Sequence, residues 1–510
     1  MSKGYSQELF ELIKSLNKSE KRHFKLFSAL YVSGKTNNYI RLFDSIDRQH
    51  QINDKAIKQQ QKLVNNYSRT KNYLYELIIK SLDNYHSQKN PNIMLNNELN
   101  KIEILSGKGL YSQCEKVIGK LEKSAYKQEK YPIILQLIDW KKVLIFESFS
   151  GNTINEELVK HYVEEENAIG RMKVYSELKK ISDKLHIVYQ TKGPVRKNQE
   201  LAALKKLIDN PVFAEKEFLS PRVEIAFNAA HAMHNNLIGD YEGMYQCYNN
   251  NFNIYKQNNS LVKSSFNEYL STINNLMYSQ YFLEKYAELK KTLLYFKTVG
   301  SETISSDTRI FISSSNMELL LCQKTGEFSE GFYKIQEIVK TLEKFGEKVD
   351  KASVIKIYFS IAYVCFGSEN YNKALGWINK IFPYQSLNIA EDTFTYAKIL
   401  EMLIHFELEN EQLIDYINLS TYRYAVKRNR LYKFEEALLI FFKKNQTSFT
   451  GKANIKKFQT LKEELLTIFK DPNEKKILSY FDIISWVQGK IEGKPFAEVV
   501  KINCMQSKKV

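Results

Sequence analysis

Residues 357–381 read IYFSIAYVCFGSENYNKALGWINKI, and this stretch decides the fold. Its first part, 357–366, is apolar at nearly every position, which predicts a helix that is covered from two sides. From 371 onward the apolar residues recur at i, i+3, i+4 and i+7, which predicts an amphipathic helix. Between the two, the GSEN sequence at 367–370 supplies stop, turn and N-cap chemistry, and Pro383 closes the unit. The stretch therefore predicts two antiparallel helices joined by a tight turn.

A single helical hairpin cannot bury its own apolar surface, so it requires neighbours of the same kind. An aromatic residue at a predicted turn, followed by apolar residues at helical spacing, recurs along the chain at Tyr111, Tyr241, Tyr286, Phe328 and Tyr371. In the Phe328 copy the small residue Gly331 stands three positions after the aromatic residue. From Tyr241 to Tyr371 these aromatics are 45, 42 and 43 residues apart. The repeat predicts an all-α fold, a superhelical α-solenoid of antiparallel helical hairpins.

The reference hairpin resembles a tetratricopeptide repeat. The positions that carry the resemblance are Tyr358, Ile361, Ala362, Tyr371, Ala374, Ile378 and Ile381. The hairpin departs from that pattern at Cys365, where the repeat has tyrosine, and at Glu369, where it has the turn glycine. The whole chain resembles tetratricopeptide-containing proteins of bacteria with degenerate repeats, although its period exceeds the usual 34 residues. The resemblance implies a TPR-like right-handed superhelix that binds a protein or peptide partner as a non-enzymatic scaffold or adaptor.

The length of the chain and its content of glycine and proline indicate the domain organisation. A chain of 510 residues is too long for one hydrophobic core, which rarely exceeds about 250–300 residues. Its 19 glycines and 8 prolines are few for this length, which favours long helices over a loop-rich β fold. We expect four parts: an N-terminal helical block at 1–90, degenerate helical hairpins at 91–220, the TPR-like array at 221–445, and a C-terminal part at 446–510. The C-terminal part consists of capping helices followed by a partly ordered tail that begins at 490.

The sequence carries no segment that predicts a membrane span or export. No apolar run reaches the roughly 18 residues that a bilayer requires, and the N-terminus has no apolar core of a signal peptide. The five cysteines lie far apart and mostly within apolar helical patterns, which is typical of small core residues in a reducing compartment. We therefore expect a cytoplasmic protein.

Catalytic and cofactor motifs are missing from the sequence. It contains no GxxxxGK[ST] or GxGxxG loop, no GxSxG nucleophile elbow and no HExxH pair. We expect neither an enzyme nor a cofactor. His231 and His234 share one helix face and would form a metal site if Asp240 or Glu224 added a third ligand. The small residues beside them favour histidines at a helix interface, so we predict no metal.

The net charge of +16 has two interpretations. It reflects either a polyanionic partner or a general enrichment in lysine. The segment in which basic and aromatic residues are most clearly clustered is 420–433, STYRYAVKRNRLYK. Its candidate binding residues are Tyr422, Arg423, Tyr424, Lys427, Arg428, Arg430 and Tyr432.

On a helix Arg423, Lys427 and Arg430 share a face, at a cost of a few tenths of a kcal/mol for each like-charge pair. Two sources would offset this cost. One is an acidic residue on a nearby helix, with Glu407, Glu409, Glu411 and Glu435 as candidates. The other is an anionic partner, because arginine forks bind phosphate and tyrosines stack on bases. The second source predicts an alternative function, an RNA- or ribosome-associated protein that binds through this basic aromatic surface.

Overall fold

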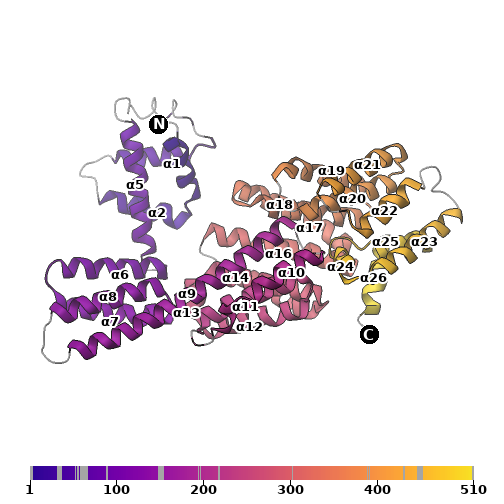
Figure 1. Cartoon of the computed structure of the whole chain (residues 1–510). Coiled ribbons are helices and arrows are strands. Elements are labelled where there is room, and N and C mark those ends of the chain that lie inside the picture. The colour runs from indigo at the N-terminus through magenta and orange to yellow at the C-terminus, as the bar shows by residue number, and fades with distance from the viewer. Residues whose placement is uncertain are drawn as a thin grey trace. The chain divides into compact units, whose positions relative to one another are not determined.

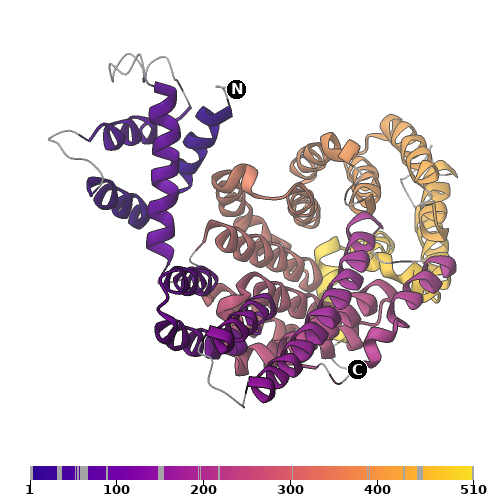
Figure 2. The same ribbon diagram turned by 60° about the vertical axis from the view of Figure 1, so that its left-hand side comes forward.

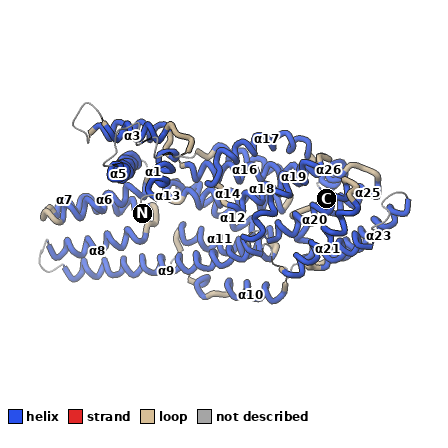
Figure 3. Tube along the Cα trace, turned by 90° about the horizontal axis from the view of Figure 1, so that it is seen from above, coloured by secondary structure: helices blue, strands red, loops and turns tan. Residues whose placement is uncertain are grey.

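The computed structural model describes residues 4–30, 37–51, 53, 57, 67–87, 90–147, 154–192, 195, 197–215, 217, 219–300, 303–387, 389, 391–428, 431–444 and 452–507. Within these ranges every regular element is a helix, and Figure 3 shows helices joined by loops. The predicted all-α class is therefore confirmed. None of the described helices combines the length and the apolar character that a bilayer crossing demands.

The chain divides into two compact units. Unit 1 comprises Met1–Ile169 and Asn259–Phe266, and unit 2 comprises Gly170–Asn258 and Asn267–Val510. The division falls inside one long helix, α9 (Ile154–Lys192). The finer four-part division expected from the sequence stays a prediction.

Unit 1 holds the N-terminal helices, coloured indigo to purple in Figure 1. These are α1 (Gly4–Ser15), α2 (Lys18–Ala29), α3 (Asn38–Asp47), α5 (Tyr67–His86), α6 (Pro91–Ser106), α7 (Tyr111–Lys127), α8 (Tyr131–Glu147) and the first part of α9, with α13 (Asn259–Ser264) added from later in the chain. Phe24 and Phe43 stack in an apolar cluster that joins α1, α2, α3 and α5. Ile118 and Ile138 belong to a second cluster in α6, α7 and α8. The first four helices thus have a core of their own.

Unit 2 is a succession of helices that pack against their neighbours in sequence. They are the second part of α9, followed by α10 (Asn198–Ile208), α11 (Pro221–Ile238), α12 (Tyr241–Gln257), α14 (Phe266–Phe282), α15 (Tyr286–Thr298), α16 (Ile304–Thr325), α17 (Phe328–Phe345), α18 (Lys351–Gly367), α19 (Tyr371–Ile381), α20 (Glu391–Glu407), α21 (Glu411–Lys427), α22 (Lys433–Lys444), α23 (Lys452–Ile468), α24 (Pro472–Lys475), α25 (Ile483–Glu492) and α26 (Phe496–Ser507). Short 3-10 turns follow several of them, at η2 (Pro211–Ala214), η4 (Gly346–Lys348), η5 (Phe382–Leu387) and η6 (Lys476–Ser479).

Consecutive helices of unit 2 form pairs, and the first helices of successive pairs also touch one another. Helix α16 packs on α18, and α18 packs on α20, so that α18 is covered from both sides. Ile357 and Ile361 of α18 are fully buried, as the apolar sequence of this helix predicts. Helix α19 buries only one stripe, formed by Ala374, Ile378 and Ile381. The predicted hairpin is therefore present, with the expected turn.

The turns between paired helices share one backbone geometry. In eight turns of the described chain a residue with positive φ ends the first helix: Gly109, Glu129, Gly239, Glu284, Gly326, Glu369, Glu409 and Gly493. The next residue donates its backbone N–H to the carbonyl five positions back, as in Glu327 N to Cys322 O (3.0 Å) and Asn370 N to Cys365 O (2.8 Å). This is the Schellman hydrogen bond, which satisfies the last carbonyls of a helix and reverses the chain.

The C-terminal helices return to the middle of unit 2. Helix α26 packs against α16, and Figures 1 and 2 both show the yellow C-terminal helices beside earlier helices of the unit. The Phe496 ring lies 5.4 Å from Phe328 and 5.8 Å from Phe366, centroid to centroid. The sequence suggested a partly ordered tail from 490 onward. Residues 496–507 are instead helical, because Phe496, Val499 and Val500 form a buried apolar face.

A candidate binding groove on helices α17 and α19

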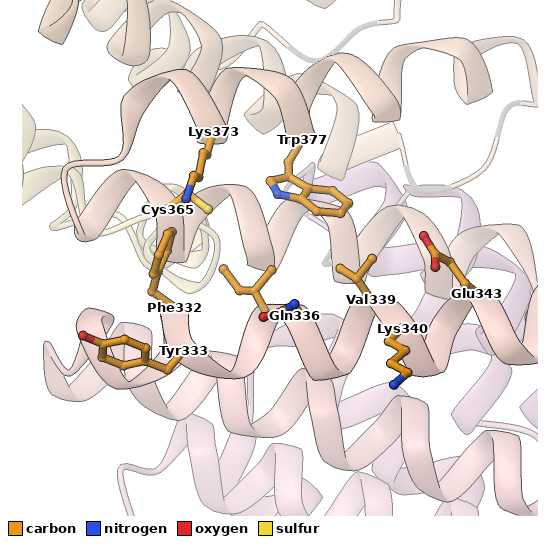
Figure 4. Close-up of a pocket in the computed structure, with 10 residues that line it drawn as sticks. Phe332, Tyr333, Gln336, Val339, Lys340, Glu343, Cys365, Lys373 and Trp377 are labelled. Carbon is orange, nitrogen blue, oxygen red and sulfur yellow. The ribbon is translucent and has the colours of Figure 1, made fainter.

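A groove of about 590 Å³ lies on the surface of unit 2 where the second helices of two successive pairs face each other. Figure 4 shows α17 and α19 as its walls and Cys365 of α18 on its floor. The lining residues are Phe332, Tyr333, Ile335, Gln336, Val339, Lys340, Glu343, Cys365, Lys373 and Trp377. The groove therefore belongs to the hairpin that decides the fold and to the one before it.

Helical spacing explains why these side chains meet. Phe332, Val339 and Glu343 lie at i, i+7 and i+11 on α17, which places them on one face of the helix. Lys373 and Trp377 lie at i and i+4 on α19 and share a face in the same way. Each wall is thus the helix face next to the buried apolar stripe, and this stripe packs the helix against α18.

Aromatic rings line the groove, and lysines lie against two of them. The Lys373 ammonium is 4.6 Å from the centre of the Phe332 ring, and the Lys380 ammonium is 3.9 Å from that of Trp377. Tyr333 is 82% exposed, which is rare for so large a ring and leaves its face open to a ligand. Cation–π contacts of this kind hold each lysine over its ring and contribute about 0.5–1 kcal/mol at exposed sites.

The groove is more basic than acidic. In the described part of the chain, the lining lysines Lys340 and Lys373 form no ion pair with a carboxylate. The same holds for Lys380, which lies beside the groove over the Trp377 ring, whereas the nearby Lys334 lies 3.1 Å from Glu330. Glu343 is the acidic residue of the lining. The positive charge of the groove is consequently available to a partner.

Cys365 contributes an apolar floor. The thiol is almost fully buried, and this burial raises its pKa to about 12, while Lys373 lowers the pKa by a smaller amount. A thiol with so high a pKa stays protonated at neutral pH and is a poor nucleophile. The groove therefore offers a contact surface of aromatic rings, aliphatic parts of side chains and a thiol, with the ammonium groups of lysines beside them.

The candidate binding residues of the basic segment at 420–433 differ in their exposure. Tyr422, Arg423 and Lys427 are exposed on α21, whereas Tyr424 is buried. Arg428 lies beside the Tyr424 ring, 5.8 Å from its centre. Tyr432 is partly buried just before α22, and Arg430 lies outside the described residues.

Two of the four acidic residues proposed to balance this segment, Glu407 and Glu435, have other partners. Glu407 lies 2.6 Å from Lys490 and accepts a hydrogen bond from the indole of Trp486. Glu435 accepts a hydrogen bond from the Tyr396 hydroxyl. Among the described residues neither Arg423 nor Lys427 forms an ion pair with a carboxylate, so no such pair in this part of the chain offsets the like charges on α21.

His231 lies where helix α11 meets the 3-10 turn η2. Its ring is tilted against the Phe213 and Phe227 rings, 4.6 Å from the centre of each. Burial lowers the pKa of His231, and the neighbouring His234 lowers it further. Among the described residues no group of three histidine, cysteine or carboxylate side chains is placed to hold a metal ion.

Sequence reasoning missed the groove residues Phe332, Tyr333 and Trp377. A signal for them exists, because all three lie outside the apolar stripes that bury α17 and α19. Phe332 and Trp377 only flank the core, and Tyr333 is mostly exposed. A large ring beside the buried stripe of an amphipathic helix is the pattern that would have identified them.

Comparison of the chain with family models, with curated protein sequences and with solved structures finds no match.

Proposed function

We propose that this protein is a TPR-like α-solenoid that acts as a non-enzymatic interaction scaffold, with the α17–α19 groove as its peptide-binding site. The period near 43 residues, the recurring Schellman turns and the stacking of α16, α18 and α20 support a solenoid of helical hairpins. Such arrays offer a long surface built from equivalent helix faces, and this surface suits an extended partner.

The observation that carries the proposal is the combination of exposed rings with unpaired lysines in one groove. Aromatic and aliphatic walls bind an apolar side chain, and Lys340, Lys373 and Lys380 attract carboxylates beside it. The partner is therefore a peptide segment with an aromatic or large aliphatic residue flanked by aspartate or glutamate.

A displayed random peptide library, panned against the full chain, tests this assignment. We expect enriched sequences with an apolar anchor next to acidic residues. A synthetic fluorescent copy of an enriched peptide should lose at least about tenfold in affinity, or 1.4 kcal/mol, in Trp377→Ala and in Lys373→Glu. Lys290→Glu on the exposed surface of α15 is the matched control for charge and should bind as the wild type does.

Two outcomes would contradict the groove assignment. One is enrichment of peptides without an acidic residue. The other is an equal loss of affinity in Lys373→Glu and Lys290→Glu, because that result would show a general charge effect. In either case the peptide-binding surface would have to be sought elsewhere on the chain.

A further inference from the structure

Glu318 of α16 joins the second helices of two successive pairs, α15 and α17. Its carboxylate lies 2.6 Å from the ammonium group of Lys297 on α15 and 3.7 Å from that of Lys334 on α17. The side chain is partly buried, so it loses part of its hydration, and ion pairs offset this cost. Two lysines of the flanking helices therefore neutralise this carboxylate.

Glu401 of α20 holds the same position two hairpins later. Glu318 precedes Gly326, the positive-φ residue of its turn, by eight residues, and Glu401 precedes the positive-φ residue Glu409 by eight residues. In the hairpin between them this position is Ile361, which is fully buried. The first and third of these hairpins thus place a carboxylate on the first helix, below the line where two second helices face each other.

The lysines that neutralise the first carboxylate have no counterparts around the second. Lys297 and Lys334 lie 13 and eight residues after the positive-φ residues of their turns. At these two places around Glu401 the residues are Phe382, just after α19, and Ile417 on α21. In the part of the chain that the structure describes, the Glu401 side chain forms neither an ion pair nor a hydrogen bond.

Lys398, one turn earlier on α20, is directed to other groups. Its ammonium lies 3.4 Å from Ser420 Oγ, 5.0 Å from the Phe382 ring centre and 5.8 Å from that of Tyr424. This face of α20 is therefore turned toward the α19–α21 seam, the strip of surface over α20 where α19 and α21 face each other. Burial raises the pKa of the Glu401 carboxyl, and Lys398 lowers it by a smaller amount. Lys398 thus compensates for the burial of this carboxylate only in part.

The α19–α21 seam is accessible at its α19 side. Glu401 is partly exposed. Tyr333, which lines the α17–α19 groove, lies seven residues after Gly326, and the residue seven positions after Glu369 is Gly376 on α19. A Cβ on Gly376 would have no atom within 4 Å, so open space takes the place of the tyrosine ring. A side chain of a partner can therefore enter the seam.

We propose that Glu401 binds the ammonium or guanidinium group of a lysine or arginine in the same peptide that occupies the α17–α19 groove. This inference rests on the proposed peptide binding and extends the binding site by one hairpin. The cation of the peptide takes the place that Lys297 and Lys334 fill beside Glu318. The aliphatic part of the basic side chain lies against Phe382.

The two parts of the binding site adjoin because α19 borders both of them. An extended peptide advances about 3.3 Å per residue, so we expect the basic residue within about five residues of the apolar anchor. Because the groove and Glu401 belong to one folded unit, the spacing between anchor and basic residue should be the same in all peptides that bind.

Two matched variants test whether Glu401 lacks a counterion in the free chain. Glu318→Gln removes two ion pairs and should lower the melting temperature by about 1–2 °C. Glu401→Gln removes a carboxylate without an ion pair, so the melting temperature should stay the same or rise. Differential scanning calorimetry measures both shifts. A loss in Glu401→Gln as large as that in Glu318→Gln would show that the chain supplies its own cation, and it would overturn the inference.

A double-mutant cycle tests the contact with the peptide. The probes are a fluorescent peptide selected by panning against the full chain and the same peptide with its lysine or arginine replaced by methionine. The wild type should bind the basic peptide at least about fivefold more tightly than the methionine peptide, whereas Glu401→Gln should bind the two within about twofold of each other. Glu318→Gln, the same substitution at the equivalent carboxylate, should keep the wild-type preference.

The outcomes separate this inference from the proposed function. Selected peptides with an apolar anchor and acidic neighbours, but with no basic residue at a fixed spacing, would overturn the role of Glu401 and leave the α17–α19 groove assignment intact. A fivefold preference that persists in Glu401→Gln would have the same meaning. If panning selects no anchored peptide at all, the proposed function and this inference both fail.

Discussion

The hairpins α16–α17 and α18–α19 are built alike but end in turns with different residues. Both turns carry the Schellman hydrogen bond, an aromatic residue that begins the second helix, and a small residue three positions later. Gly326 has the positive φ in the first turn, with φ 74°, and Glu369 has it in the second, with φ 59°. The same backbone is thus reached with and without glycine.

The difference lies in what approaches each turn. A Cβ on Gly326 would lie 2.7 Å from the backbone oxygen of Ala497 and 2.8 Å from the backbone nitrogen of Lys501, both on α26. Glu369 is exposed, so its side chain extends into solvent. The comparison indicates that the close approach of the α26 backbone requires glycine at position 326, whereas positive φ alone is tolerated at a modest cost.

The largest expected effect tests the packing that the two hairpins share. Gly331 and Ala374 are the small residues of their second helices, and Ala374 is fully buried. Ala374→Trp should lower the free energy of unfolding by about 3 kcal/mol, because a large ring cannot enter a filled helix contact without displacing it. Thermal unfolding followed by circular dichroism measures the loss.

Lys373→Ala is the matched control for this change, because Lys373 is the preceding residue and is exposed. It should shift the stability by no more than about 0.5 kcal/mol. Equal melting temperatures for the two variants would mean that α19 does not pack through Ala374, and the hairpin assignment would fail.

An intermediate effect is expected at the first turn. Gly326→Ala should cost about 2–3 kcal/mol, since the new Cβ adds a clash with the α26 backbone to the strain of positive φ. Gly493→Ala, in the turn between α25 and α26, has φ 66° and no atom within 4 Å of the new Cβ. It should cost only about 1 kcal/mol, the strain alone. Urea unfolding of both variants measures the difference, and equal losses would show that α26 does not hold Gly326 in solution.

The helices could be predicted from the sequence because their signals are local. The apolar periodicity of 371–381 and the GSEN turn at 367–370 lie within one hairpin and need no knowledge of the rest of the chain. A resemblance to tetratricopeptide repeats was useful because it rests on these same local spacings.

The groove could not be predicted because it depends on which helices become neighbours. Phe332 and Trp377 lie 45 residues apart in the chain, and only the packing of α17 and α19 on α18 brings them to one groove. The helix at 496–507 escaped notice for a related reason. Its short apolar face gains stability from Phe328 and Phe366, which are more than a hundred residues away in sequence.

The smallest effect tests the second turn and should have the opposite sign. Glu369→Gly should raise the free energy of unfolding by about 0.5 kcal/mol, since relief of positive-φ strain outweighs the added entropy of glycine in the unfolded chain. Glu337→Gly, the same substitution at an exposed position inside α17, should instead lower the stability by about 1 kcal/mol. Urea unfolding curves of the two variants measure opposite shifts if backbone conformation decides the outcome. A loss of stability in both would mean that the Glu369 side chain makes a stabilising contact in solution, and the two turns would then differ in more than the approach of α26.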